Sequence, residues 1–203
     1  MKSLSEIETV SKRASRASGF SWGVAEEIGK NIRMLEMFGI CGIENLNYYF
    51  RIRKNKNFEK LSLISKENKT AKLQFCPIYT GLNFLDQVRS LDGFGEIKFY
   101  NIAFPMLFLP FISRASEVIG KKLKLNIDNR FFLLNFNTSI YSNFLNEGVV
   151  ELGNNVSIKF QENKDSFKES EWGELYKLSE NTFVEENDSL KNTGAGAGLT
   201  DND

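Results

Sequence analysis

The spacing of apolar residues changes from a helical to an alternating pattern between residues 53 and 60, and this change constrains the fold more than any other feature. A recurrence every three or four positions is typical of amphipathic helices, and alternation over short runs is typical of half-buried strands. Helices that precede strands indicate an α+β fold rather than a doubly wound parallel sheet. We expect an N-terminal segment of two to three helices packed on a mainly antiparallel β-sheet.

The helical part has clear boundary signals. A first helix over residues 3–19 begins at a capping box, in which Ser3 is followed by Glu6. A second helix over residues 21–39 begins at a serine and ends at a glycine. A shorter third helix is expected over residues 43–50.

The alternating part predicts two hairpins and several single strands. The first hairpin covers residues 61–75 with a turn at 67–69, and a short helix follows over 82–88. The second joins residues 149–152 to 156–160 through Gly-Asn-Asn at 153–155. The remaining expected strands are 97–99, 106–111, 123–127 and 131–136, and the remaining small helices are 113–119 and 171–178.

The length fits a single domain over residues 1–203, with a helical part (1–53), a sheet part (60–160) and an acidic C-terminal segment (161–203) that ends in a glycine-rich tail. Charge is uneven along the chain. Residues 1–56 carry ten Lys and Arg against six Asp and Glu, whereas residues 161–203 carry four against eleven. Acidic segments of this kind are typically solvated or face a partner.

Several functional classes are disfavoured by composition. The formal net charge is zero, so we expect no nucleic-acid partner. The longest apolar run, residues 102–112, is about half the length that crosses a bilayer and contains two prolines, so we expect no membrane association. Two cysteines and a start without an apolar core favour a reducing, cytoplasmic location.

The sequence contains no histidine. This excludes a Ser-His-Asp triad, a Cys-His pair and a histidine-based zinc site within the chain. Acid–base chemistry would depend on a carboxylate, lysine, tyrosine or cysteine with a shifted pKa. No motif indicates a cofactor, and the metal ligands that the sequence suggests are weak candidates in the C-terminal tail.

The C-terminal tail is the first candidate site. Alternating Gly and Ala allow close approach of the backbone to a ligand, and successive N–H groups can hold an anion. Such termini are also commonly flexible. Asp201 and Asp203 are weak catalytic candidates and hard oxygen ligands that could hold Mg²⁺ if other oxygens joined them. The candidate ligand-binding residues of the tail are Gly194, Gly196, Gly198, Thr200 and Asp201.

Three further residues are candidates outside the tail. Cys76 could be a nucleophile if a cation lowered its pKa, although an unpaired cysteine is more commonly a small buried hydrophobe. Asp86 follows in the same stretch and could line a site. Trp22 heads the second helix and is a candidate ligand-binding residue. The basic and aromatic stretch over 48–56 is interpreted as a solvated helix end.

Four segments together resemble one bacterial family, the domain of unknown function numbered 3726. They are residues 3–7, 22–27, 76–81 and 182–203, and the last ten residues are the most specific part. The resemblance extends from end to end and implies a shared fold and a shared site without naming a reaction. The sequence departs from the family pattern at Glu185, where the family favours proline after Val184.

Three functional classes stay open at this point. In the first, the chain is an accessory subunit that binds a protein partner, or a second copy of itself, through its C-terminal segment. In the second, it binds a small metabolite without chemistry. In the alternative, it is a cytosolic small-molecule enzyme with a histidine-free carboxylate site, formed by the tail and the segment from Cys76 to Asp86. The absence of histidine favours the binding classes.

Overall fold

The computed structural model describes residues 2–70, 72–144 and 148–182. The chain divides into two units, Met1–Asn163 and Lys164–Asp203. This division lies close to the predicted start of the acidic segment at residue 161. The expectation of a single domain over the whole chain stays a prediction.

Three helices open the first unit: α1 (Leu4–Ala17), α2 (Trp22–Met37) and α3 (Gly42–Arg53). The hydroxyl oxygens of Ser3 and Ser21 each accept a backbone N–H from the first turn that follows, so α1 and α2 begin where the sequence predicts. Gly29 allows α1 and α2 to pack closely, because a Cβ there would lie 2.8 Å from the carbonyl oxygen of Glu8. All three predicted N-terminal helices are confirmed.

A six-stranded sheet in the order β1-β2-β6-β3-β4-β5 follows the helices. β1 pairs with β2 in parallel, and all other neighbouring strands pair antiparallel. The predicted α+β class with a mainly antiparallel sheet is therefore confirmed. The strands are β1 (Glu67–Asn68), β2 (Glu96–Ala103), β3 (Lys122–Ile127), β4 (Arg130–Asn135), β5 (Ser139–Ser142) and β6 (Leu152–Gln161).

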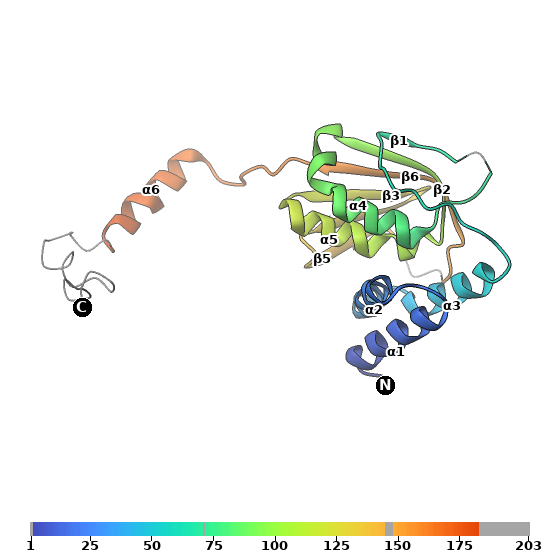
Figure 1. The fold of residues 1–203 in the computed structure, drawn as a ribbon. Helices are drawn as coiled ribbons and strands as arrows, with labels where there is room; N and C mark the ends of the chain where they lie inside the picture. Colours follow the sequence, from blue (N-terminus) through green and yellow to red (C-terminus); the bar gives the residue numbers. More distant parts are fainter. Residues whose placement is uncertain (1, 71, 145–147, 183–203) are drawn as a thin grey trace, which may run out of the picture. The chain divides into compact units, whose positions relative to one another are not determined.

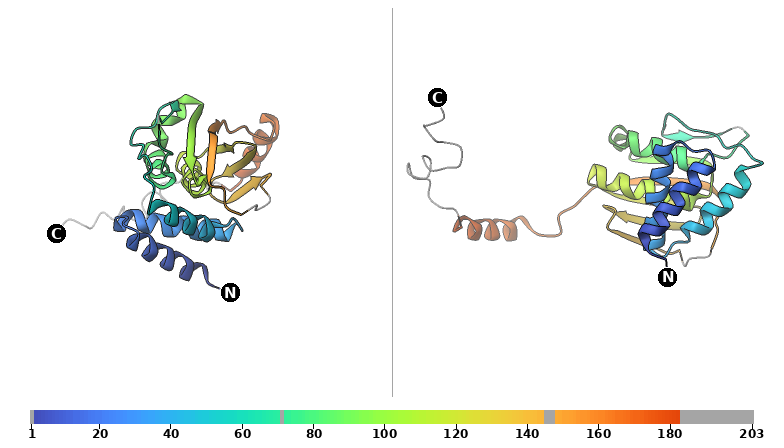
Figure 2. Two further views of the ribbon diagram at one scale, coloured as in Figure 1. Left: turned by 90° about the vertical axis from the view of Figure 1, so that its right-hand side faces the viewer. Right: turned by 60° about the horizontal axis from the view of Figure 1, so that its bottom comes forward.

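Helices α4 (Pro77–Leu91) and α5 (Leu109–Ile119) cover one face of the sheet (Figure 1). The core lies between these two helices and the sheet. There the rings of Phe84, Phe99 and Phe108 pack together with centroids 5.5–6.4 Å apart. The N-terminal helices lie beside this layer (Figure 2), and α2 contacts α5 while α3 contacts the short 3-10 helix η2 (Pro105–Leu107). The opposite sheet face is mostly polar along β2, β3 and β6, as is common for antiparallel sheets, but it exposes Phe131 of β4 and Tyr141 of β5.

The predicted hairpin over residues 61–75 is wrong. Glu67 and Asn68, expected in its turn, form β1 at the edge of the sheet. Tertiary hydrogen bonds explain the difference, because the Asn68 amide donates to the carbonyl oxygen of Lys98 on β2 at 3.0 Å. The helix expected over 82–88 is part of the longer α4, which begins at Pro77 because proline fits the first helical turn.

The strand expected over residues 106–111 is also wrong. This apolar run forms η2 and the start of α5, and a proline occupies the first turn of each helix. All of its residues are buried. A helix that is buried on every side has apolar residues at all positions, without the three-to-four-residue spacing of an amphipathic helix. The sequence of such a short run therefore cannot be distinguished from that of a buried strand.

The predicted hairpin with a turn at residues 153–155 is a third error, because these residues belong to the continuous strand β6. β6 lies between β2 and β3 and pairs with both. Hydrogen bonds on both edges outweigh the turn preference of Gly-Asn-Asn. Gly153 is needed for packing, since a Cβ there would lie 2.8 Å from Val156. The observed hairpins join β3 to β4 and β4 to β5 instead.

In the second unit, the described residues form one helix, α6 (Glu169–Glu180), which includes the helix predicted over 171–178. The backbone N–H of Lys168 donates to the carboxylate of Glu171 and closes the first turn. None of the residues of α6 is buried. No helix in the described part of the chain is both long and apolar enough to cross a bilayer.

Candidate functional site

Cys76, Asp86 and Trp22 lie within the described residues, whereas the tail candidates Gly194, Gly196, Gly198, Thr200, Asp201 and Asp203 lie outside them. Trp22 is 60% exposed at the start of α2, and the guanidinium of Arg16 lies 5.5 Å from the centroid of its ring. Asp86 is exposed on α4.

Cys76 precedes the first residue of α4 and is buried. Burial raises the pKa of its thiol, and hydrogen bonds from Tyr49 and the first turn of α4 only partly oppose this effect. The phenol of Tyr49, 3.1 Å from the sulfur, also has a raised pKa, mainly because of burial. Neither group ionises readily at neutral pH, so this pair is suited to packing rather than nucleophilic chemistry.

Of the sequence candidates, Asp86 lines a cleft, whereas Trp22 and Cys76 lie next to segments that line it. The start of α2, next to Trp22, and the α4 segment that follows Cys76 line a cleft of about 630 Å³. The sequence analysis treats these two segments as separate candidates. The polar residues of the cleft are Ser21, Glu26 and Glu27 from the α2 side and Tyr79, Asn83 and Asp86 from α4.

The two glutamates of this cleft are held in ion pairs. Glu26 lies 3.3 Å from both Lys12 and Lys30, and these lysines lower the pKa of its carboxyl. Partial burial raises the pKa of Glu27, but hydrogen bonds from Arg114 and Lys30 outweigh it and the net pKa is lowered. Both carboxylates are charged at neutral pH and fit poorly the role of a general acid.

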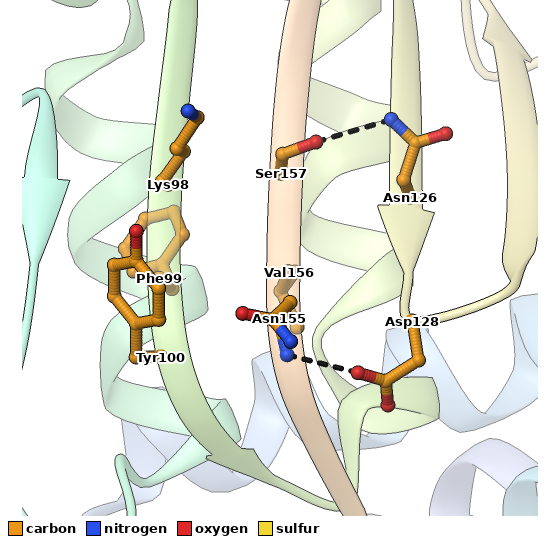
Figure 3. Close-up of a pocket in the computed structure, with 8 residues that line it drawn as sticks. All are labelled: Lys98, Phe99, Tyr100, Asn126, Asp128, Asn155, Val156 and Ser157. Atoms are coloured by element: carbon orange, nitrogen blue, oxygen red, sulfur yellow. Dashed lines mark hydrogen bonds between the residues drawn. The ribbon is translucent and has the colours of Figure 1, made fainter.

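The open face of the sheet contains a shallow polar pocket of about 270 Å³ (Figure 3). Within it, Asn126 of β3 donates to the hydroxyl of Ser157 on β6 at 3.1 Å. Asp128 accepts the backbone N–H groups of Asn154 and Asn155 at 3.2 and 2.9 Å. Several polar groups of the pocket are thus already hydrogen-bonded to one another, as is common on a solvated sheet face.

A third concave surface is an apolar groove of about 210 Å³ between α1 and α3. Val10 of α1 is 59% exposed there, and Ile43 of α3 is 41% exposed. Ile7, Ala14 and Leu46 also line the groove. The sequence predicts both helices, but Val10 and Ile43 are not among the candidate site residues.

Helix α6 carries a stripe of large apolar side chains that are exposed within the second unit. Trp172, Leu175 and Tyr176 are 50–64% exposed and share one face of the helix at i, i+3 and i+4 spacing. Phe167 stacks on Trp172 with ring centroids 5.6 Å apart. The sequence analysis predicted this helix but missed the stripe. The spacing of Trp172, Leu175 and Tyr176 was the available signal.

The described residues contain no cluster of three or more Cys, Asp or Glu side chains that could hold a metal ion.

No curated protein and no solved structure matches this chain. The model of the family described as "Protein of unknown function (DUF3726)" matches residues 2–75, which include α1, α2 and α3. The match ends before Cys76 and before the tail. The predicted resemblance to this family is confirmed over residues 2–75, and its predicted extension to the rest of the chain stays a prediction.

Proposed function

We propose that the protein is an accessory, partner-binding protein that attaches to another protein through its acidic C-terminal segment. The observation that carries this proposal is the exposed stripe of Trp172, Leu175 and Tyr176 on α6. Large aromatic side chains exposed next to one another on a short helix gain free energy when a partner removes them from water.

The chemistry of α6 suits a helix that lies in a groove of its partner. Trp and Tyr are the residue types that most often dominate binding energy, and i, i+3, i+4 spacing presents them to one surface. The rest of the helix carries four glutamates and one lysine. A partner groove with an apolar floor and a basic rim therefore fits it best. The glycine-rich tail extends this proposed binding segment.

The enzyme alternative has less support in the described residues. Cys76 is buried with a raised pKa, and the glutamates of the cleft beside Asp86 are committed to ion pairs. A metabolite bound without chemistry would use the same cleft. A cytoplasmic location is part of our proposal and rests on the small number of cysteines.

The test is native mass spectrometry of the tagged full chain recovered from its own host. The double variant Trp172→Ala and Leu175→Ala removes the stripe, and the double variant Ser170→Ala and Lys177→Ala is the matched control on the opposite face. We expect a stoichiometric protein partner in the wild type and the control, and at least about a tenfold loss in the stripe variant.

A third variant that lacks residues 194–203 measures the contribution of the tail. A partner retained in full by the stripe variant would refute the role of α6. Recovery of the chain without any protein partner but with a bound metabolite would favour the enzyme or metabolite-binding classes instead.

A further inference from the structure

The open face of the sheet, opposite α4 and α5, carries lysine, aromatic and amide side chains together. Figure 3 looks onto part of this face, with helices behind the strands. Residues paired across neighbouring strands lie on the same face of a sheet, so the strand register identifies the members of the open face. One row across it contains Lys98, Ser157, Asn126 and Phe131, and the next contains Glu96, Lys159, Lys124, Leu133 and Tyr141.

The open face has an excess of positive charge. Strands β2, β3 and β6 present four lysines to it, Lys98, Lys122, Lys124 and Lys159. Within the described part of the chain only Lys159 forms an ion pair, 3.6 Å from Glu96. Glu67 on β1 is paired with Lys69 at 3.1 Å, and Asp128 accepts two backbone N–H groups. Charge complementarity therefore favours an anionic partner for this face.

Exposed aromatic rings lie beside these lysines. Phe131 of β4 is 38% exposed and Tyr141 of β5 is 62% exposed, and the two are diagonal neighbours across their strands. The amino group of Lys124 lies 5.2 Å from the centroid of the Phe131 ring. At the other side of the face, Lys69 lies 5.0 Å from the centroid of the Tyr100 ring. A ring next to a cation can stack on a base while the cation contacts the neighbouring phosphate.

We infer that the open face binds single-stranded nucleic acid, with bases stacked on Phe131 and Tyr141 and phosphates held by Lys98 and Lys124. Sheets of this kind, with helices on one face and aromatic residues on the other, are a common platform for single strands, whose unstacked bases can reach the rings. The amide of Asn126 and the hydroxyl of Ser157 lie between the lysines and Phe131, where a base edge can hydrogen-bond to them.

The inference goes beyond the proposed function and does not depend on α6. The expectation of no nucleic-acid partner rests on the zero net charge of the whole chain, which does not describe the charge of one face. A duplex fits this face less well, because its bases are already stacked on one another.

Fluorescence anisotropy with the full chain tests the lysines, with labelled oligothymidylate and oligouridylate of about 12 nucleotides as probes. We expect a Kd of about 1–100 µM that rises with salt concentration. The double variant Lys98→Gln and Lys124→Gln should bind at least about tenfold more weakly at low salt. The double variant Arg13→Gln and Lys54→Gln removes the same charge from exposed positions on α1 and after α3, and it should bind like the wild type.

Substitutions at Tyr141 test the stacking. Tyr141→Ala should weaken binding at least about fivefold, whereas Tyr141→Phe keeps the ring and should bind like the wild type. The side chain is exposed, so both substitutions spare the core. Inorganic polyphosphate, which has charge but no bases, should compete less well than an unlabelled oligonucleotide of the same charge.

Three results would overturn the inference. The first is the absence of binding to either oligonucleotide at about 100 µM protein. The second is an equal loss in the two glutamine double variants, which would place the contact elsewhere. The third is unchanged binding by Tyr141→Ala with full competition by polyphosphate, which would indicate a general polyanion surface instead. The variant Trp172→Ala and Leu175→Ala should bind the oligonucleotides like the wild type, so the proposed function of α6 stands or fails separately.

Discussion

The phenol oxygen of Tyr49 in α3 lies 3.1 Å from the sulfur of Cys76 at the start of α4. Both side chains are buried. This contact joins the helical part to the sheet part at the end of the segment that matches the DUF3726 family. It gives Cys76 a structural place in the core and removes it from solvent.

The first prediction concerns the reactivity of this thiol. In a Cys41→Ser variant, where Cys76 is the sole cysteine, a disulfide reagent at pH 8 should react at least about 100-fold more slowly with the native protein than with the denatured chain. The reason is that burial raises the pKa of the thiol and blocks access to it. Similar rates in the two states would return Cys76 to the list of candidate nucleophiles.

The second prediction concerns the packing of α4 on α5. A Cβ at Gly81 would overlap the ring of Phe111. Gly81→Ala should therefore lower the free energy of unfolding by about 1–3 kcal/mol, measured by urea denaturation. Gly93→Ala is the control, because no atom lies within 4 Å of a Cβ there, and it should change stability by less than about 1 kcal/mol. Equal effects would contradict the close approach of the two helices.

The third prediction concerns the ion pair between Glu27 of α2 and Arg114 of α5. Glu27→Gln should lower the free energy of unfolding by about 1–2 kcal/mol at pH 7, because Arg114 loses its charged partner while partly buried. Glu26 is exposed, so Glu26→Gln should lower the free energy of unfolding by a smaller amount.

The pH dependence of this loss follows from the pKa of Glu27, which is lowered in the folded state from its ordinary value of 4.5. The Glu27 carboxyl binds a proton less tightly in the folded protein than in the unfolded chain. Its contribution to the free energy of unfolding is therefore present above pH 4.5 and is lost as the pH falls below that value. The stability difference between wild type and Glu27→Gln should shrink at pH 3. A difference that is constant between pH 7 and pH 3 would assign the loss to packing instead.

The fourth prediction concerns Asp128, which follows β3 with a positive φ of 51° and accepts two N–H groups from β6. Asp128→Ala should lower the free energy of unfolding by about 1–2 kcal/mol, since it removes both acceptor oxygens and places alanine in the left-handed region of backbone conformation. Asp128→Asn should cost less, because asparagine tolerates this conformation and keeps one acceptor oxygen. Thermal denaturation compares the two variants, and equal losses would show that neither the retained acceptor oxygen nor tolerance of the left-handed backbone contributes to stability.

The sequence alone predicted those helices and strands that depend on interactions between residues close to one another in the chain. The N-terminal helices were predictable because serine caps, glycine stops and a helical apolar period act within a few residues of one another. The same holds for β2 and β3, in which apolar residues that face the core alternate with residues that face solvent. The class of the fold followed from the order of these elements.

Tertiary structure decided the rest. Residues 153–155 have turn propensity, but pairing on both edges keeps them in β6, and Asn68 joins the sheet through a bond to Lys98 thirty residues away. For the candidate site, the sequence singled out Trp22 and Cys76 but could not show that their segments meet at one cleft. It also could not show that Val10 of α1 stays exposed. Apolar spacing identifies which side chains share a face, and only packing determines whether another element covers that face.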